Sequence, residues 1–281
     1  MTDETIVVYG VTVHRIRATE DIDEHNVKKG DLGGFVQRKL NIRGRAWVFD
    51  NAVVMENAYV TDNAAVRGNA FVSGNAGVRG HAVVCEHAVV FDEARVNEYA
   101  MVAGNAKVKG NAQLFGHAVI KGHARVSGNA VLEDGACVSG EAIINGNARV
   151  GDGAYITGNV VIADRAIVRG VVELDGRTWI QDRVLIDIYP NGQLLRICSD
   201  AVFQGNAVIH SLNDFIIMHN NWSSGRHFVW TRSNNMWSAG CFYGTGEELV
   251  AKAMRDSAAS GRGYKRAVDY VESMLKDEVT K

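Results

Sequence analysis

Four histidines recur at regular intervals in the middle of the sequence, and histidine suits both metal binding and proton transfer near neutral pH. They are His81, His87, His117 and His123, and the interval from His81 to His117 equals that from His87 to His123. Imidazole nitrogens are common zinc ligands, and a well-placed imidazole is the most frequent general base. His87 and His123 are therefore candidate catalytic bases, and His81, His117 and His123 are an alternative zinc set. The plain alternative is an exposed histidine tolerated in a turn.

A second candidate site lies between residues 213 and 244, where tryptophan and arginine are interleaved. Indole rings stack on planar ligands, and guanidinium groups bind phosphate in a bidentate manner. This segment is predicted to bind a nucleotide-like ligand or to form a hot spot for a protein partner. The alternative is an aromatic mini-core beneath the C-terminal helices, with arginine at its rim. The candidate ligand-binding residues are Trp222, Arg226, Trp230, Arg232 and Trp237.

These candidates must be positioned by a six-residue repeat that fills the middle of the chain. Every sixth position from Val36 to Ile186 is Val, Ile or Leu, and the position two residues earlier is usually Ala. In an Ala-x-Val triplet the first and third side chains point to one face. The x-Gly-Asn that follows predicts a corner, because Gly and Asn tolerate a positive φ. Three such hexads make one triangular coil, so the fold class is an all-β solenoid whose coils stack at about 4.8 Å.

The repeat divides the chain into three parts. The run of hexads that forms the β-helix is interrupted at 187–196, which contains the single proline, Pro190. The repeat resumes in shifted phase at Ile197. Two helices are expected after Thr245, whose spacing to Glu248 is that of a capping box. The predicted parts are a β-rich N-terminal cap at 1–35, a β-helix at 36–217, and an α+β cap of short strands and two helices at 218–281.

The middle residue of each triplet points outward, and one of the three resulting faces is apolar along the rod. Continuous apolar faces are rare on soluble monomers and usually mark interfaces. The sequence therefore predicts lateral self-association, most simply as a trimer, unless the C-terminal segment folds back over one face. The predicted interface includes Trp47, Val83, Met101, Val119 and Tyr155.

Composition excludes several classes of protein. The chain has 281 residues with 30 Gly and one Pro, and its formal net charge is −2. This near-neutral balance creates no field for general nucleic-acid binding or for an anionic membrane. No apolar run is long enough to span a bilayer, and the first residues are acidic, unlike a signal peptide. The four cysteines have no paired or metal-like spacing, so we expect a cytoplasmic protein with reduced thiols.

Over residues 36–186 the repeat resembles the left-handed parallel β-helix of the hexapeptide-repeat family. Acyl transfer from coenzyme A is the commonest activity of that family, so the resemblance implies an acyltransferase as the alternative function, with His87 or His123 as base and coenzyme A as cofactor. Those enzymes carry a catalytic histidine on or near a protruding loop, and the uninterrupted run offers none. The histidine spacing also resembles that of the γ-class carbonic anhydrases, but the interval from His117 to His123 is six residues rather than five.

A closer resemblance covers nearly the whole chain. The segments VTVHRIRAT, KKGDLGGFV and RAWVFDNA near the N-terminus, and WSAGCFYGTGEEL near the C-terminus, resemble the YdcK-type hexapeptide proteins of enteric bacteria and their phages. Members are described as transferases from the fold alone, and no agreed catalytic residue carries over. The interpretation that fits the residues best is a non-catalytic oligomeric binding protein, acting in a bacterial or phage-infected cell. The phage resemblance implies a counter-defence role, by sequestering a nucleotide-like ligand or blocking a host protein.

Overall fold

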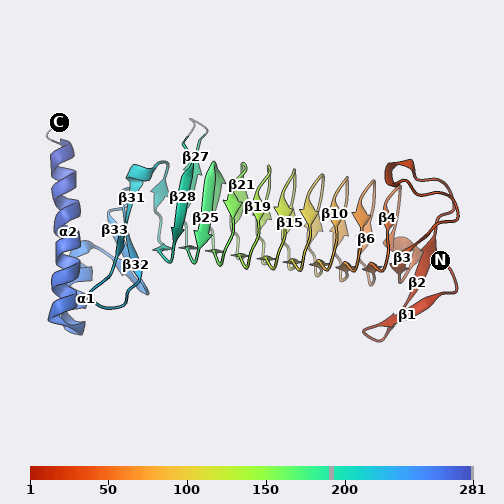
Figure 1. The fold of residues 1–281 in the computed structure, drawn as a ribbon, viewed down its shortest axis with the longest axis horizontal. Coiled ribbons are helices and arrows are strands. Elements are labelled where there is room, and N and C mark those ends of the chain that lie inside the picture. The colour runs from red at the N-terminus through yellow and green to blue at the C-terminus, as the bar shows by residue number, and fades with distance from the viewer. Residues whose placement is uncertain (190–192, 280–281) are drawn as a thin grey trace.

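The chain folds into a long rod with parallel sheets along its sides and two helices across its C-terminal end (Figure 1). The computed structural model describes residues 1–189 and 193–279. Within these residues, three sheets of 12, nine and nine strands line the rod, and a four-stranded antiparallel sheet precedes the helices. The prediction of an all-β parallel β-helix with a helical cap is confirmed.

The three long sheets take successive strands in turn. Among the described residues their antiparallel pairs all lie in the first sheet, where β1 pairs with β2 and β2 pairs with β3. The first sheet comprises β1 (Thr5–Val8), β2 (Val11–Arg17), β3 (Leu32–Val36), β5 (Val53–Val54), β8 (Phe71–Val72), β11 (Val89–Val90), β14 (Lys107–Val108), β17 (Arg125–Val126), β20 (Ile143–Ile144), β23 (Val161–Ile162), β26 (Trp179–Ile180) and β29 (Val202–Phe203). The second comprises β4 (Trp47–Val48), β7 (Ala65–Val66), β10 (Val83–Val84), β13 (Met101–Val102), β16 (Val119–Ile120), β19 (Cys137–Val138), β22 (Tyr155–Ile156), β25 (Val172–Gly176) and β28 (Leu195–Ser199). The third comprises β6 (Tyr59–Val60), β9 (Gly77–Val78), β12 (Arg95–Val96), β15 (Gln113–Leu114), β18 (Val131–Leu132), β21 (Arg149–Gly151), β24 (Ile167–Gly170), β27 (Leu185–Ile188) and β30 (Val208–Ile209).

The inside of the rod is filled by the small and branched apolar residues of the repeat. Ala82 and Val84 have no exposed surface. Because β10 pairs in parallel with β7 and β13, Val84 lies between Val66 of the preceding coil and Val102 of the following one. Like positions therefore stack on like positions, and a single inserted residue in a coil would turn its apolar side chains outward.

The corners differ from the prediction in one respect. Positive φ falls on the residue before the predicted Asn, which is Gly or an acidic residue, and the Asn that follows lies outside this region of φ. The asparagines instead form amide ladders between coils, as in the bond from Asn111 Nδ2 to Asn129 Oδ1 at 3.0 Å. The acidic corner residues with positive φ are Asp50, Glu56, Asp62, Glu86, Asp92, Glu98, Asp134, Asp152, Asp164 and Asp182.

Most of these acidic corners accept a hydrogen bond from the next coil. Glu86 Oε2 accepts from the backbone N–H of Gly104 at 2.8 Å, and Asp50 Oδ2 accepts from Gly68 at 2.9 Å. The carboxylate therefore satisfies a backbone donor that the turn leaves without a strand partner. This contact explains why acidic residues persist at a conformation that L-residues otherwise avoid.

The N-terminal cap covers the beginning of the first sheet. Val13 of β2 packs with Phe35 and Val53 in a small buried cluster, and the Tyr9 ring meets Phe71 edge-on at 5.7 Å. The cap also contains two short 3₁₀ helices, η1 (Asp23–His25) and η2 (Lys39–Asn41).

Near its C-terminal end the helix changes register once. Leu174 of β25 pairs with Ile156 of the preceding coil at the regular interval, but its partner in the following coil, Ile197 of β28, lies further along the chain. Ile186 keeps the same longer interval to Ile209. This is the change of phase that the sequence shows at Ile197. The predicted interruption at 187–196 is described only in part, because residues 190–192, with Pro190, lie outside the described residues.

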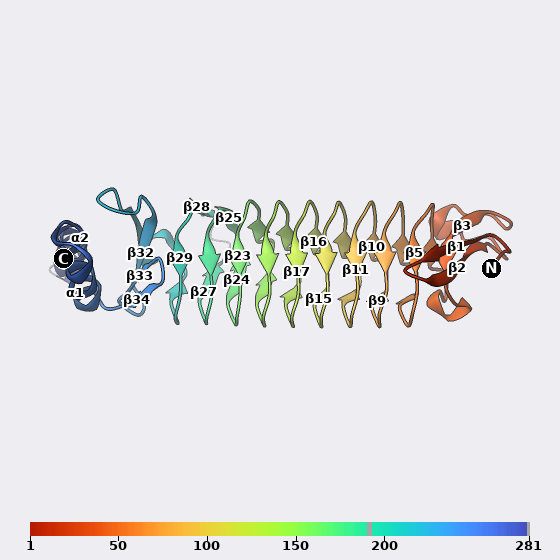
Figure 2. The ribbon, with the colours of Figure 1, turned by 90° about the horizontal axis from the view of Figure 1, so that it is seen from below.

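The C-terminal module is an antiparallel sheet backed by two helices (Figure 2). Thr245 and Glu248 form the predicted capping box, with Thr245 Oγ1 accepting from the Glu248 N–H. The sheet starts before residue 218, because its first strand begins at Phe215. The elements are η3 (Leu212–Asp214), β31 (Phe215–His219), β32 (His227–Thr231), β33 (Met236–Ala239), β34 (Phe242–Gly244), α1 (Gly246–Asp256) and α2 (Ala258–Val279).

Candidate functional site

The corner histidines lie on the outside of the coils and do not converge. The His81 and His117 rings sandwich the Tyr99 ring, with centroid distances of 4.9 and 5.0 Å and interplanar angles of 3° and 12°. An intervening phenol ring keeps the two imidazoles too far apart to ligate one zinc ion. No group of three or more His, Cys, Asp or Glu side chains among the described residues has the geometry to hold a metal. The alternative zinc set of His81, His117 and His123 therefore has no geometric support.

The two candidate bases occupy the neighbouring edge. His87 is exposed, and its Nε2 lies 3.4 Å from the Asn69 amide of the preceding coil. His123 is exposed two coils further on. Both side chains thus take the place of a ladder asparagine, and the acyltransferase alternative stays a prediction that rests on the family resemblance.

Two of the five predicted ligand-binding residues lie in a core. Trp230 and Trp237 are only 1 % and 2 % exposed, and they pack with Phe228, Leu249 and Val268 between the antiparallel sheet and the helices. The Trp230 N–H donates to Asn235 Oδ1 at 2.9 Å. These rings form the aromatic mini-core that the sequence allowed as the alternative.

Trp222 stands at the edge of that mini-core. Its ring meets Tyr264 edge-on at 5.3 Å, and its buried Nε1 has no hydrogen-bond partner among the described residues. A cavity of about 320 Å³ beside it is also lined by His219 and Arg266. Burial raises the pKa of the Tyr264 hydroxyl, which outweighs the opposing hydrogen bond from Asn220.

The two predicted arginines lie in different surroundings. Arg232 Nη1 donates to Glu278 Oε2 at 2.6 Å, and this hydrogen bond raises the pKa of the guanidinium further. Arg232 also lies over the Trp230 ring at 5.6 Å, so it is a rim residue of the mini-core. Arg226 is exposed and lines a separate groove. The structure therefore does not bring the five predicted residues into one site.

The groove beside Arg226, here called the C-terminal groove, has a volume of about 590 Å³, within the range of small-molecule sites. It lies between the outer face of the last coils, at β26 and β29, and the loops that flank β32 and β33. Trp179 of β26 is 47 % exposed on one wall. The groove is lined by Arg177, Trp179, Gln181, Asp200, Val202, Gln204, Arg226, His227, Gly240 and Cys241.

An Asp–His pair joins the two sides of this groove. Asp200 Oδ1 accepts from the His227 backbone N–H at 2.9 Å and lies 2.5 Å from His227 Nδ1. Burial acts to raise the pKa of Asp200, but the hydrogen bonds and charge interaction with His227, together with a local backbone hydrogen bond, hold the pKa below its ordinary value. Because an ionised carboxylate only accepts, Nδ1 carries the proton in this pair. Nε2 of His227 makes no hydrogen bond within the described part of the chain.

A second set of hydrogen bonds fixes the opposite end of the groove. Gln204 is 9 % exposed, and its Nε2 donates to the Phe242 carbonyl at 3.3 Å while its Oε1 accepts from Gln181 at 3.1 Å. The turn that carries Cys241 is therefore tied to the last coils. Sequence reasoning found Arg226 in this groove and missed Arg177, Asp200 and His227 as a set, because no spacing links positions that only the tertiary fold brings together.

The predicted oligomer face is partly covered by the chain itself. Trp47 is 5 % exposed, and its ring packs against the backbone at Gly33 of the N-terminal cap. Met101 and Tyr155 are 38 % and 40 % exposed on the same sheet, and Val83 and Val119 are half-buried. An apolar strip along the middle of the second sheet thus stays open.

No family model matches the chain, and no curated protein matches it at a significant level of similarity. Among the described residues, neither of the two α-helices has the length and apolar character of a membrane span.

Proposed function

We propose that the protein is a non-catalytic binding protein whose C-terminal groove takes a nucleotide-like ligand. The observation that carries this proposal is the meeting of two exposed arginines and an exposed tryptophan in one groove of about 590 Å³. Arg177 and Arg226 supply guanidinium groups for phosphate. Trp179 supplies an aromatic face for a base or another planar ring. The Asp200–His227 pair adds a ring nitrogen, Nε2, for a polar group of the ligand.

Hydrogen bonds between the walls of the groove support its role in binding. The hydrogen bonds of Asp200 and Gln204 tie both sides of the groove together before any ligand arrives, which lowers the entropic cost of binding. In the cytoplasm of a bacterial or phage-infected cell, such a groove would sequester a nucleotide signal, and this counter-defence role rests on the resemblance to phage-encoded proteins.

Self-association forms part of the proposal. The open strip at Met101 and Tyr155 supports a trimer formed through the second sheet, since exposed apolar strips of this kind favour burial against another copy. Light scattering at micromolar concentration tests it: the wild type is expected to be trimeric and a Met101→Lys, Tyr155→Lys variant monomeric. A monomeric wild type would remove the trimer and leave the groove untouched.

The groove is tested by calorimetric titration with AMP, a cyclic dinucleotide, ADP-ribose and coenzyme A. For a nucleotide that binds, Arg177→Ala and Arg226→Ala are each expected to weaken affinity about tenfold, because each removes a charge-assisted hydrogen bond. Arg95→Ala, an exposed arginine on the third sheet, is the matched control and should bind as the wild type does. Affinity that is unchanged in both groove variants contradicts the proposal, and turnover of acetyl-coenzyme A would replace it with the acyltransferase.

A further inference from the structure

The opposite end of the rod carries a further cavity, which the proposed function does not use. This N-terminal pocket has a volume of about 380 Å³ and lies where the first coil opens toward the N-terminal cap. Its floor is apolar: Ile42, an inward residue of the first coil, and Ile22 of the cap are both partly exposed there. Beneath them Val36, Ala46 and Ile16 are fully covered, at 0 %, 2 % and 5 % exposure.

The floor is apolar because the first coil has no coil beneath it. In the rest of the rod, the inward side chains of each coil are covered by those of the coils on either side. Here the segment around Ile16 and Ile22 takes the place of the missing coil, and Ile22 and Ile42 stay only partly buried. A solenoid end normally hides the inward side chains of its last coil, so the partial exposure of Ile42 is a departure from complete capping.

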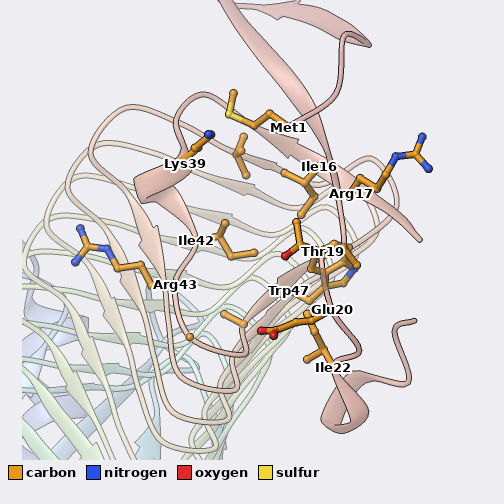
Figure 3. A pocket seen from close by; sticks show the side chains of 14 residues that line it. Met1, Ile16, Arg17, Thr19, Glu20, Ile22, Lys39, Ile42, Arg43 and Trp47 are labelled. Atoms are coloured by element: carbon orange, nitrogen blue, oxygen red, sulfur yellow. The ribbon is translucent and has the colours of Figure 1, made fainter. Parts of the chain in front are cut away.

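The rim of the pocket is cationic. Arg17, Lys39 and Arg43 line it together with a single carboxylate, that of Glu20. None of these four side chains takes part in an ion pair among the described residues. Figure 3 shows Ile16, Ile42 and Trp47 around the opening, Lys39 at one edge and Glu20 on the opposite side. The guanidinium groups of Arg17 and Arg43 are directed outward on either flank.

We propose that the N-terminal pocket binds an aliphatic carboxylate, with its chain on the apolar floor and its head group near Lys39 and Arg43. An apolar floor beneath a rim of net positive charge is complementary to an anion that carries a hydrocarbon chain. Burying each methylene of that chain contributes to affinity. Lys39 and Arg43 have long flexible side chains that reach over a bound head group while their charges stay in water.

Decanoate is the probe, and isothermal titration of the full chain below the critical micelle concentration is the measurement. We expect one decanoate per chain, with octanoate about tenfold weaker, because two buried methylenes are lost. Decyltrimethylammonium has the same chain with a positive head group and is expected to bind more weakly than decanoate. A Lys39→Glu, Arg43→Glu variant should reverse this order, since both side chains are exposed and their replacement leaves the buried floor intact.

A Lys107→Glu, Lys121→Glu variant, which replaces two exposed lysines in the middle of the rod, is the control for the change in net charge and should keep the order of the wild type. Circular dichroism melting of each variant establishes that the rod is folded. The proposal is overturned if the wild type binds decanoate and decyltrimethylammonium with equal affinity. It is also overturned if the Lys39→Glu, Arg43→Glu variant still binds decanoate more tightly than decyltrimethylammonium. The absence of decanoate binding also overturns the proposal, whether or not light scattering shows that the chain self-associates.

Discussion

The acidic corners lead to a prediction in which a larger side chain is tolerated better than a small one. Gly104 lies at a corner with φ +68°, and a Cβ built there would lie 2.8 Å from the backbone nitrogen of Gly122 in the next coil. Replacing Gly104 by Ala places an L-residue in the left-handed region, which costs roughly 1–2 kcal/mol. Displacing the neighbouring coil adds about 1 kcal/mol, and the lower entropy of the unfolded alanine chain returns about 0.5 kcal/mol. Gly104→Ala is therefore expected to destabilise the protein by about 2 kcal/mol.

An aspartate at position 104 has the same positive φ and the same close Cβ contact as an alanine, but its side chain can offset part of the cost. Asp visits the left-handed region more readily than Ala, and its carboxylate can accept from the Gly122 N–H, as Asp92 does from Gly110 at 3.1 Å. Such a bond contributes about 1 kcal/mol at an exposed position. The aspartate variant should then be about 1 kcal/mol more stable than the alanine variant.

Urea denaturation followed by circular dichroism measures both variants against the wild type. Glu86→Ala provides the reciprocal test, because it keeps the Cβ and the positive φ of 62° while removing the bond to the Gly104 N–H. It should lose about 1 kcal/mol. If Gly104→Asp proves as unstable as Gly104→Ala, or Glu86→Ala as stable as the wild type, the carboxylates do not stabilise the corners and the reasoning is wrong.

Three further predictions concern the C-terminal module. The folded-state pKa of Asp200 is lowered, so its pairing with His227 stabilises the fold above the carboxyl's unfolded pKa. That stabilisation is lost as the pH falls through the folded-state pKa. The melting temperatures of Asp200→Asn and the wild type should therefore differ at pH 7 and converge in acid. Trp230→Ala should cost about 3–5 kcal/mol by urea denaturation, because it empties the mini-core, whereas Trp222→Ala at its edge should cost less. Thr245→Ala should cost about 1 kcal/mol through loss of the capping box, and Thr245→Ser should restore most of it.

The fold was predictable from the sequence because its determinants are local and periodic. Each Ala-x-Val triplet specifies which side chains point inward. Because the triplet recurs every six residues, every coil has the same pattern of inward and outward side chains. The interval between Leu174 and Ile197 shows the limit of this, since the change of phase was visible but the extended strands β25 and β28 around it were not. The corners were predicted only in part. The sequence identified Gly as the turn residue, but it did not predict that carboxylates at the corners accept hydrogen bonds from the next coil.

The candidate site was less predictable because its parts have no common spacing. The cluster of tryptophans and arginines between 213 and 244 drew attention to this segment, but the same composition serves a core and a binding site equally well. Burial separates the two: Trp230 and Trp237 pack inside, and Arg226 remains exposed. Burial is a property of the packed module, since it depends on where α1 and α2 lie against the sheet.

The sequence by itself determined the solenoid, the positions of its corners and the place where its phase changes, because the stacking interactions between coils recur once per coil and produce a periodic pattern. Only the tertiary structure decided what lies at the two ends of the rod. Arg177, Asp200 and Arg226 come from a coil edge, a strand connection and a hairpin loop, and they meet because Asp200 and His227 are hydrogen bonded across the groove. The pocket at the other end exists because the first coil has no neighbour beneath it. Both the groove and the pocket arise where the repeat stops, and the periodicity that predicts the rest of the rod does not extend to these positions.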